Sequence, residues 1–361
     1  MKRTLLVTGS SGLIGSEAVR HFAAQGWRVV GVDNNGRQDF FGPGGDTRPT
    51  LAALQRDVAG FEHVELDIRN RAGLLRLVQR ERPGAVIHCA AQPSHDLARS
   101  RPFDDFETNA VGTLNLLEAV RAASADTPFV FLSTNKVYGD APNEKPLVEL
   151  ATRFDYANSE DQFGIDESCR IDRSMHSLFG ASKASADLLV QEYGRAFGMP
   201  TVCLRAGCMT GPRHAGVELH GFLSYLVKSA VHGRDYKIIG HGGKQVRDQI
   251  HAHDVCTAIE SWLAKPGRAD VYNLGGGRES CGSVLECLAL VDDAVGRRTA
   301  RWHEPRARAG DHIVYLSDTR RFEAAFPGWG RSRRLQDLIE ELVRAEVDAA
   351  VEPDASCLPA R

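Results

Sequence analysis

The chain has 361 residues, of which 42% are hydrophobic, 25% charged and 7% aromatic, proportions close to those of an ordinary globular protein. Its formal net charge is −3 and it has no long Lys/Arg run, so no nucleic-acid partner is expected. The eight cysteines form no CxxC pair, which favours reduced thiols in a cytoplasmic protein and no metal site. No apolar stretch is long enough to span a bilayer, so no membrane partner is expected.

Short apolar runs alternate with amphipathic helical patterns over the first 135 residues or so, which is typical of βαβ units around a parallel sheet. Strands are predicted at Thr4–Thr8, Arg28–Val32, His63–Leu66, Ala85–His88 and Phe129–Ser133, and helices at Leu13–Gln25, Ala72–Arg82 and Asn109–Ala123. The polar stretch from Asn34 to Ala59 is rich in Gly, Pro and Asp and is predicted to be a long loop.

A second irregular stretch is predicted from Asp140 to Ser174, followed by a long helix from about His176 to Phe197 and a sixth strand at Thr201–Arg205. Beyond Gly211 the predicted elements are shorter and alternate with basic, glycine-rich loops. They are helices at Gly221–His232, His253–Ala264, Ser283–Val295 and Leu335–Val351, and strands at Tyr236–Ile239 and Val271–Leu274. These elements indicate a smaller lobe that closes over the carboxyl edge of the sheet.

A glycine-rich turn, Thr8-Gly9-Ser10-Ser11-Gly12-Leu13-Ile14-Gly15, follows the first strand directly. Its glycines allow a tight turn, approach of backbone amides to a pyrophosphate and close helix packing, and the next helix N-terminus stabilises the phosphate charge. Asp33 ends the second strand 18 residues after Gly15, where a carboxylate can accept both hydroxyls of an adenosine ribose. Because that carboxylate would repel a 2′-phosphate, the sequence predicts NAD as the cofactor.

Further cofactor contacts are predicted along the carboxyl edge, where open α/β sheets hold their ligands. Asp67 can reach the adenine edge or, equally well, cap the next helix. The predicted cofactor-binding set is Gly9, Gly12, Leu13, Ile14, Gly15, Asp33, Asn34, Asp67, Ile68, Ala90, Ala91, Gln92, Asn109 and Lys183.

These features together predict an α/β fold, a Rossmann-type doubly wound parallel sheet with a smaller C-terminal α/β substrate-binding lobe. Residues 1–205, with parts of 240–275, are expected to form the NAD-binding domain. Residues 206–350 are expected to form most of the lobe, and 352–361 a frayed tail.

The chain resembles the extended short-chain dehydrogenase/reductase family over nearly its whole length, and within it the CDP-paratose 2-epimerase (tyvelose epimerase) group. The matching stretches are Val32-Asp33-Asn34 with Phe40-Phe41-Gly42, Ser133-Thr134-Asn135-Lys136-Val137-Tyr138-Gly139-Asp140, His176-Ser177-Leu178-Phe179-Gly180-Ala181-Ser182-Lys183 and Gly243-Lys244-Gln245-Val246-Arg247-Asp248.

This resemblance implies an epimerase in which tightly held NAD oxidises a hydroxyl of a nucleotide sugar, the keto-sugar rotates, and hydride returns to the other face. It favours a CDP-sugar, with UDP or GDP possible, and a homodimer formed through the helices at Asn109–Ala123 and His176–Phe197. The nearest alternative is a nucleotide-sugar dehydratase, because the same oxidation acidifies a neighbouring C–H bond.

The predicted catalytic residues are Thr134, Lys136 and Lys183. In the family, the equivalent of Thr134 positions the hydroxyl, and a tyrosine four residues before the equivalent of Lys183 removes its proton. Position 179 is Phe here, and a missing general base typically costs about 10²–10⁴-fold in rate. Loss of catalysis, leaving an NAD-binding sensor or scaffold, is therefore a further alternative.

Lys136 and Lys183 rank together as replacements for that tyrosine, ahead of Tyr138. If the strand continues past Thr134, Lys136 points to the same side as the threonine. The alternative role of Lys136 is an ion pair with an acid such as Asp140. The nearby His176 and Asp96 fit substrate contacts or helix caps better than bases.

Recognition of a nucleoside diphosphate sugar needs cations for the phosphates. Arg247 stands in the family's diphosphate-binding position, and its guanidinium offers a bidentate fork. Arg213 and the stretch from Arg308 to His312 could add to it, although a surface ion pair is the competing role for any one arginine. The predicted substrate-binding set is Asn135, His95, Phe179, Arg213, Arg247 and Asp311.

Overall fold

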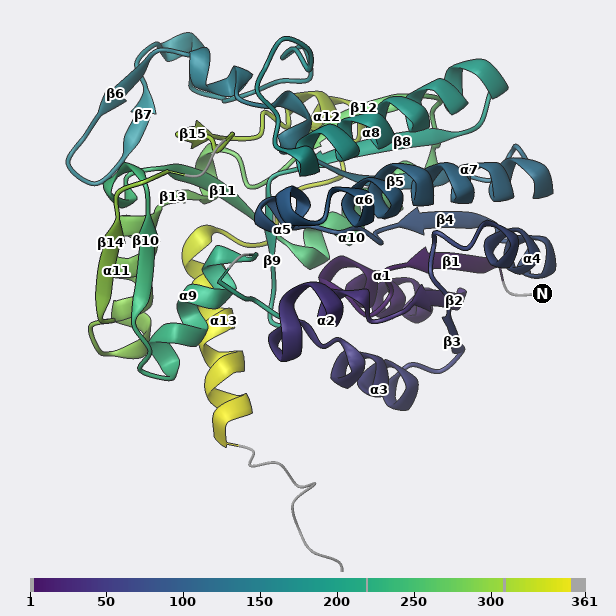
Figure 1. Ribbon diagram of the computed structural model, residues 1–361, viewed down its shortest axis with the longest axis horizontal. Helices are drawn as coiled ribbons and strands as arrows, with labels where there is room; N and C mark the ends of the chain where they lie inside the picture. Colours follow the sequence, from purple (N-terminus) through teal and green to yellow (C-terminus); the bar gives the residue numbers. More distant parts are fainter. Residues whose placement is uncertain (1–2, 219, 308–309, 352–361) are drawn as a thin grey trace, which may run out of the picture.

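A seven-stranded parallel sheet forms the centre of the protein (Figure 1). The computed structural model describes residues 3–218, 220–307 and 310–351. The strand order is β12-β8-β5-β4-β1-β2-β3. Its members are β1 (Thr4–Thr8), β2 (Arg28–Asp33), β3 (Phe61–Glu65), β4 (Ala85–His88), β5 (Phe129–Thr134), β8 (Thr201–Ala206) and β12 (Asp270–Leu274). The order reverses between β1 and β4, and such a reversal opens a crevice at the carboxyl edge where ligands bind.

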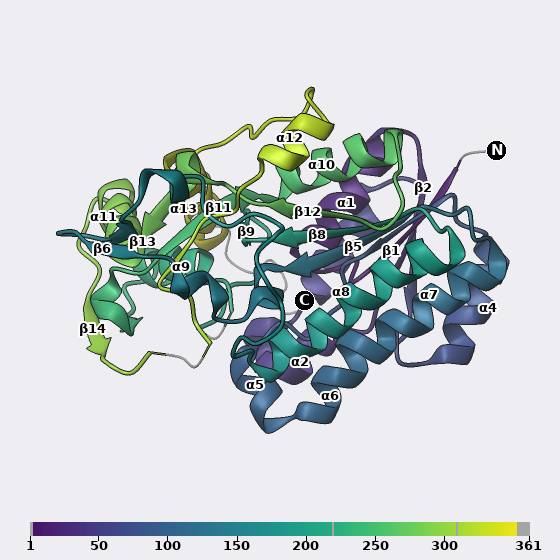
Figure 2. The same ribbon diagram turned by 90° about the horizontal axis from the view of Figure 1, so that it is seen from above.

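Helices cover both faces of this sheet (Figure 2). On one face lie α4 (Arg71–Glu81), α7 (Gly112–Ala123) and α8 (Leu178–Phe197); on the other lie α1 (Leu13–Ala24) and α10 (Ala252–Ala264). Because both faces are covered, the strands are continuous apolar runs such as Leu5-Leu6-Val7, in which every side chain is buried. Each such burial stabilises the fold by about 1.5–3 kcal/mol. The predicted Rossmann-type, doubly wound sheet is confirmed.

A smaller lobe lies beside the central sheet, and its helices α9 (Phe222–Val231), α11 (Val284–Val295) and α13 (Leu335–Val351) share one apolar core. Beside them lie a sheet of β9 (Cys208–Thr210), β11 (Val246–His251), β13 (Cys281–Ser283) and β15 (Val314–Tyr315), and a parallel pair of β10 (Tyr236–Ile239) and β14 (Arg301–Glu304). β9 follows β8 after a single residue and pairs with β11, so the lobe is joined directly to the carboxyl edge of the central sheet.

The prediction of a long loop from Asn34 to Ala59 is wrong. The stretch contains α2 (Gly36–Phe41), a short 3-10 turn at Gly42–Gly45 and α3 (Arg48–Asp57). Pro49 lies in the first turn of α3, where its missing N–H costs nothing, and Leu54 is buried in the core beside α1. A helix therefore forms here despite the glycine and proline content, because the proline is in the first turn and Leu54 packs in the core.

The second predicted loop, Asp140 to Ser174, is mostly irregular but contains the hairpin β6 (Leu147–Glu149) and β7 (Phe154–Tyr156). Three short helical segments follow β4, namely α5 (His95–Ser100), α6 (Pro102–Phe106) and a π-helical turn at Glu107–Val111, and α12 (Arg320–Ala325) follows β15. Within the described residues, no helix is both long and apolar enough to cross a membrane. Arg308 and the predicted tail at 352–361 lie outside the described residues.

Candidate functional site

Two glycines of the turn after β1 have no room for a side chain. Gly9 has φ +66°, and a Cβ there would lie 2.7 Å from the backbone nitrogen of Ala90. A Cβ on Gly15 would lie 2.0 Å from the carbonyl oxygen of Gly9. α1 therefore starts directly against the turn, with its N-terminal amides at the crevice, which is the cradle that a pyrophosphate requires. The residues present fit the dinucleotide predicted from the sequence.

Asp33 is fixed at the end of β2 by two backbone amides, those of Ser11 at 2.9 Å and Asn35 at 2.8 Å. Its carboxylate is thus held beside the glycine turn, where an adenosine ribose would lie. Asp67 pairs with Arg69 at 2.7 Å. The alternative role of Asp67 as a helix cap is wrong, because the side chain that caps α4 belongs to Asn70.

A cavity of about 520 Å³ extends from the glycine turn across the carboxyl edge of the sheet into the lobe. Most of the predicted site residues line it, and they come from the part of the chain around the central sheet and from the lobe. Around the central sheet they are Gly9, Gly12, Leu13, Ile14, Gly15, Asp33, Asn34, Asp67, Ile68, Ala90, Ala91, His95, Thr134, Asn135, Lys136, Phe179 and Lys183, and in the lobe they are Arg213, Arg247 and Asp311.

Two predicted cofactor contacts, Gln92 and Asn109, are not among the lining residues. Both side chains are buried. Asn109 accepts the backbone N–H of Gln92 at 2.9 Å, donates to its carbonyl at 3.0 Å and donates to Ser182 Oγ at 3.1 Å. These two residues therefore brace the loop after β4 against α8 from behind the cavity wall.

The expectation that the strand continues past Thr134 is wrong. β5 ends there, and Asn135–Tyr138 is a 3-10 turn, because the Thr134 hydroxyl accepts the backbone N–H of Lys136 at 3.2 Å. Lys136 nevertheless lines the cavity. Tyr138 is fully buried and its hydroxyl donates to Asn273 at 2.7 Å while it accepts from Arg205 at 3.2 Å, so it points away from the cavity.

Lys183 lies on α8, one turn after Phe179. Its ammonium donates to the carbonyl of Leu132 at 2.8 Å and sits 4.0 Å from the ring centre of Phe131. Burial lowers the pKa of Lys183 to about 8, against the opposing effect of the Asp187 carboxylate. A buried lysine at this depth can both bind a ribose hydroxyl and lose its proton near neutral pH.

The phenyl ring of Phe179 is almost fully buried, and its centre lies 5.0 Å from that of the His95 imidazole. Gly180 lets α8 begin against the turn after β5, because a Cβ there would lie 2.8 Å from the carbonyl oxygen of Lys136. The two motifs that carry the catalytic candidates are therefore in direct backbone contact. His176 is not a lining residue; its Nε2 lies 2.7 Å from the carbonyl oxygen of Val137.

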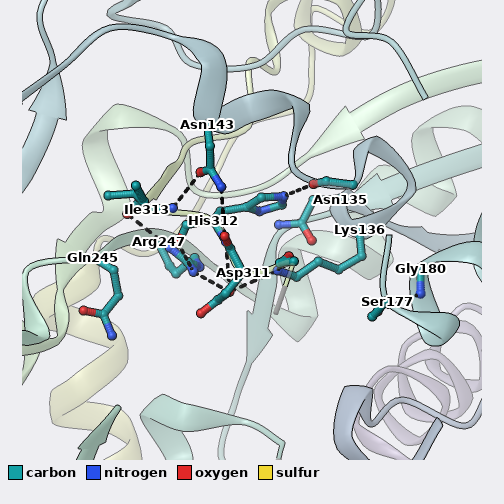
Figure 3. A network of polar contacts seen from close by, with 12 residues as sticks. Asn135, Lys136, Asn143, Ser177, Gly180, Gln245, Arg247, Asp311, His312 and Ile313 are labelled. Carbon is teal, nitrogen blue, oxygen red and sulfur yellow. Dashed lines mark hydrogen bonds and ion pairs between the residues drawn. The ribbon is translucent and has the colours of Figure 1, made fainter. Parts of the chain in front are cut away.

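Lys136 pairs with Asp311 at 3.1 Å, and Asp311 also pairs with Arg247 at 2.7 Å (Figure 3). The predicted alternative for Lys136, an ion pair with an acid, is therefore present, but the partner is Asp311 and not Asp140, whose carboxylate accepts the backbone N–H of Met175. Burial lowers the pKa of Lys136, an effect that Asp311 opposes and the Arg247 charge reinforces. Arg213 lines the cavity and pairs with Glu17 at 2.7 Å.

Sequence reasoning missed Arg37, which spans the cavity from α2 to the lobe. Its guanidinium donates to the carbonyl of Ala215 at 2.7 Å and packs on the ring of Phe41 at 4.7 Å. His220 lies at 3.4 Å from the other terminal nitrogen. The signal available was the adjacent Phe40-Phe41-Gly42 motif, which places this stretch at the cofactor end of the cavity.

Fold and site together define a dinucleotide-binding enzyme in which one cavity extends from the glycine turn past Thr134 and Lys183 into the lobe. The chain belongs to the NAD dependent epimerase/dehydratase family, whose family model matches residues 5–275. The predictions of NAD as the cofactor and of an NAD-dependent nucleotide-sugar epimerase are confirmed at this level.

Similar proteins span the whole chain. CDP-paratose 2-epimerase from Salmonella typhi is 32% identical over 345 residues, covering 94% of this chain and 97% of its own. dTDP-glucose 4,6-dehydratase 1 from Escherichia coli is 30% identical, covering 95% and 91%. Among solved structures, UDP-glucose 4-epimerase from Thermus thermophilus in complex with NAD has a TM-score of 0.77 at 27% identity, covering 96% of this chain and 99% of its own.

Proposed function

We propose that the chain epimerises the sugar of a nucleoside diphosphate sugar, with a CDP-sugar as the favoured substrate. One observation carries this proposal: a single cavity joins the glycine turn and Asp33 at one end to Arg247 at the other, with Thr134, Lys136 and Lys183 between them. The likeness to CDP-paratose 2-epimerase over nearly both full chains supports the choice of CDP. In this proposal residues 1–205, with parts of 240–275, form the domain that holds NAD, and residues 206–350 form most of the lobe that holds the nucleotide sugar.

When bound, NAD supplies the hydride acceptor at the sugar carbon. The glycine turn holds the pyrophosphate, Asp33 the adenosine ribose and Lys183 the nicotinamide ribose. Thr134 orients the sugar hydroxyl. Because Phe179 cannot take a proton, the hydroxyl proton passes to a lysine, and we assign this role to Lys136, since Lys183 already holds the nicotinamide ribose in this proposal.

The proposal also includes a homodimer and a cytoplasmic location. Leu188 and Phe197 on α8 are each nearly half exposed, which supports a homodimer formed through α7 and α8. A cytoplasmic location fits the sequence, in which the cysteines form no CxxC pair.

Incubation of the purified protein with CDP-, UDP- and GDP-sugars in deuterated water tests the reaction. An epimerase that returns the same hydride gives a product of unchanged mass, without solvent deuterium. A dehydratase gives a product that has lost one water and gained deuterium. If no sugar produces NADH absorbance or product, the chain is a binding protein and the proposed activity is wrong.

A further inference from the structure

One oxygen of the Asp311 carboxylate holds two cations at the substrate end of the cavity (Figure 3). Its Oδ1 lies 3.1 Å from Lys136 Nζ and 2.7 Å from a terminal nitrogen of Arg247. The same oxygen accepts the backbone N–H of His312 at 3.0 Å. Lys136 follows β5 of the central sheet and Arg247 lies on β11 of the lobe, so Asp311 links the two parts of the protein.

This cluster carries one more positive than negative charge. The side chains of Lys136, Arg247 and Asp311 are only 13%, 12% and 28% exposed. Two further titratable groups among the described residues interact with Lys136, and neither adds charge: burial lowers the pKa of His312 well below its usual range, and burial raises the pKa of Cys208 to about 11. In such a partly dehydrated site, each cation makes the other harder to keep charged.

The terminal nitrogens of Arg247 are already occupied by protein acceptors. One donates to the carbonyls of Val246 at 2.8 Å and Ile313 at 3.4 Å, and the other donates to Asp311 and to the carbonyl of His312. A diphosphate that binds the terminal nitrogens must therefore displace an existing partner. The carboxylate is the partner it replaces, because a phosphate offers the same fork a larger negative charge while the carbonyls are fixed in the backbone.

We propose that Asp311 is a positioning residue that couples diphosphate binding at Arg247 to the protonation of Lys136. This inference rests on the proposed function, in which Arg247 binds the diphosphate and Lys136 accepts the hydroxyl proton. In the free site, two cations share one carboxylate, and Lys136 gives up its proton more readily. When phosphates occupy Arg247, Asp311 acts on Lys136 alone, and the lysine then holds a proton more strongly.

The coupling prepares the lysine for its reaction. With a nucleotide sugar bound, the proton comes from the sugar hydroxyl: the O–H bond breaks, an N–H bond forms at Lys136, and the hydride on the same carbon passes to bound NAD. On return of the hydride, Lys136 gives the same proton back to the sugar oxygen. With CDP alone there is no hydroxyl to supply the proton, so it must come from the solvent.

Proton uptake on CDP binding therefore tests the proposal. Calorimetric titration of the NAD-loaded protein with CDP, in two buffers of different ionisation enthalpy, measures it at mildly alkaline pH, where the phosphates are fully ionised. The wild type is expected to take up as much as about one proton per CDP. Asp311→Asn and Lys136→Met are expected to bind CDP with at most a small part of that uptake, and Asp311→Glu to recover part of it.

A matched control and a second readout separate coupling from a loss of structure. Asp161 pairs with Lys145 outside the cavity, and Asp161→Asn is expected to take up protons like the wild type. In turnover of CDP-paratose, the acid limb of kcat moves by about 1–3 pH units towards lower pH in Asp311→Asn, because the lost carboxylate no longer favours the ammonium form. A structural role alone would change kcat without moving this limb.

Equal uptake by Asp311→Asn and the wild type overturns the proposal, and so does CDP binding to the wild type without uptake across the alkaline range. Both results leave the proposed function intact. If CDP, UDP and GDP all fail to bind, the proposed function itself is wrong, and the coupling with it. If Asp311→Asn does not fold, Lys136→Met is compared with the wild type instead. Proton uptake on CDP binding that is as large in Lys136→Met as in the wild type overturns the coupling.

Discussion

Replacement of Lys136 by methionine is the most direct perturbation of the proposed chemistry. Methionine is unbranched and only one heavy atom shorter than lysine, but it cannot carry a proton. Asp311 retains its 2.7 Å partner Arg247, so the substitution leaves no isolated buried charge and the fold is expected to persist. Loss of a positioned base lowers kcat by about 10²–10⁴-fold. This corresponds to about 2.7–5.4 kcal/mol of transition-state stabilisation.

Initial rates with CDP-paratose, followed by NMR, measure this loss, and Lys145→Met outside the cavity is the matched control. A second substitution, Phe179→Tyr, is expected to restore much of the rate in the Lys136→Met background, because it places a phenol one helical turn before Lys183. A Lys136→Met enzyme within about twofold of the wild-type rate would refute the reasoning, because a change that small is far below the contribution of a general base.

Three further outcomes are expected. Gly9→Ala should lose bound NAD, measured as cofactor released on denaturation, because its Cβ would lie 2.7 Å from a backbone nitrogen. Gly26→Ala is the control and should keep NAD, because it has the same backbone strain of a positive φ, +86°, but no atom lies within 4 Å of its Cβ. Arg205→Met should lower the free energy of unfolding in urea by about 3–5 kcal/mol, because it leaves the fully buried Asp187 carboxylate without the guanidinium that pairs with it. A loss below about 1 kcal/mol would contradict this. The wild type should gain stability relative to Lys183→Met as the pH rises from about 8 to 10.5. Burial lowers the pKa of Lys183 to about 8, so the unfolded chain binds more protons than the folded chain over that range. If the free energy of unfolding in urea changes equally with pH in the two proteins, this prediction is wrong.

Elements buried on both faces could be predicted from the sequence almost to the residue. The predicted strands Thr4–Thr8 and Ala85–His88 have the bounds that the structure shows. Their signal is local, since a continuous apolar run between turn residues has few other solutions. The helix α3 was missed because its only buried side chain, Leu54, gives too little periodicity to outweigh Gly42–Gly45 and Pro49. Its existence depends on packing against α1, which no local pattern reveals.

The contacts of the site also divide into those that the local sequence predicts and those that it does not. The glycine turn and Asp33 belong to one βαβ unit, so their spacing in the sequence predicts that they lie together. The contact of Lys136 with Asp311 joins residues 175 positions apart, and that of Arg37 with Ala215 joins residues 178 apart. Both depend on how the lobe closes on the sheet. No periodicity or motif contains that information, so the sequence predicts which residues lie at the site but not which of them pair.

Lys136 lines the cavity for a different reason from the one that the sequence suggests. The sequence predicts a strand that continues past Thr134, yet the Thr134 hydroxyl turns the chain by capping the backbone N–H of Lys136 itself. The turn then brings the lysine backbone against Gly180, next to the position of the missing tyrosine. Proton transfer can therefore move from α8 to the turn after β5 without moving the sugar, because both motifs border the same part of the cavity. Under the proposed function, Lys136 is the base in place of the tyrosine that is missing at Phe179. The rates of Lys136→Met and of the double variant with Phe179→Tyr test this replacement directly.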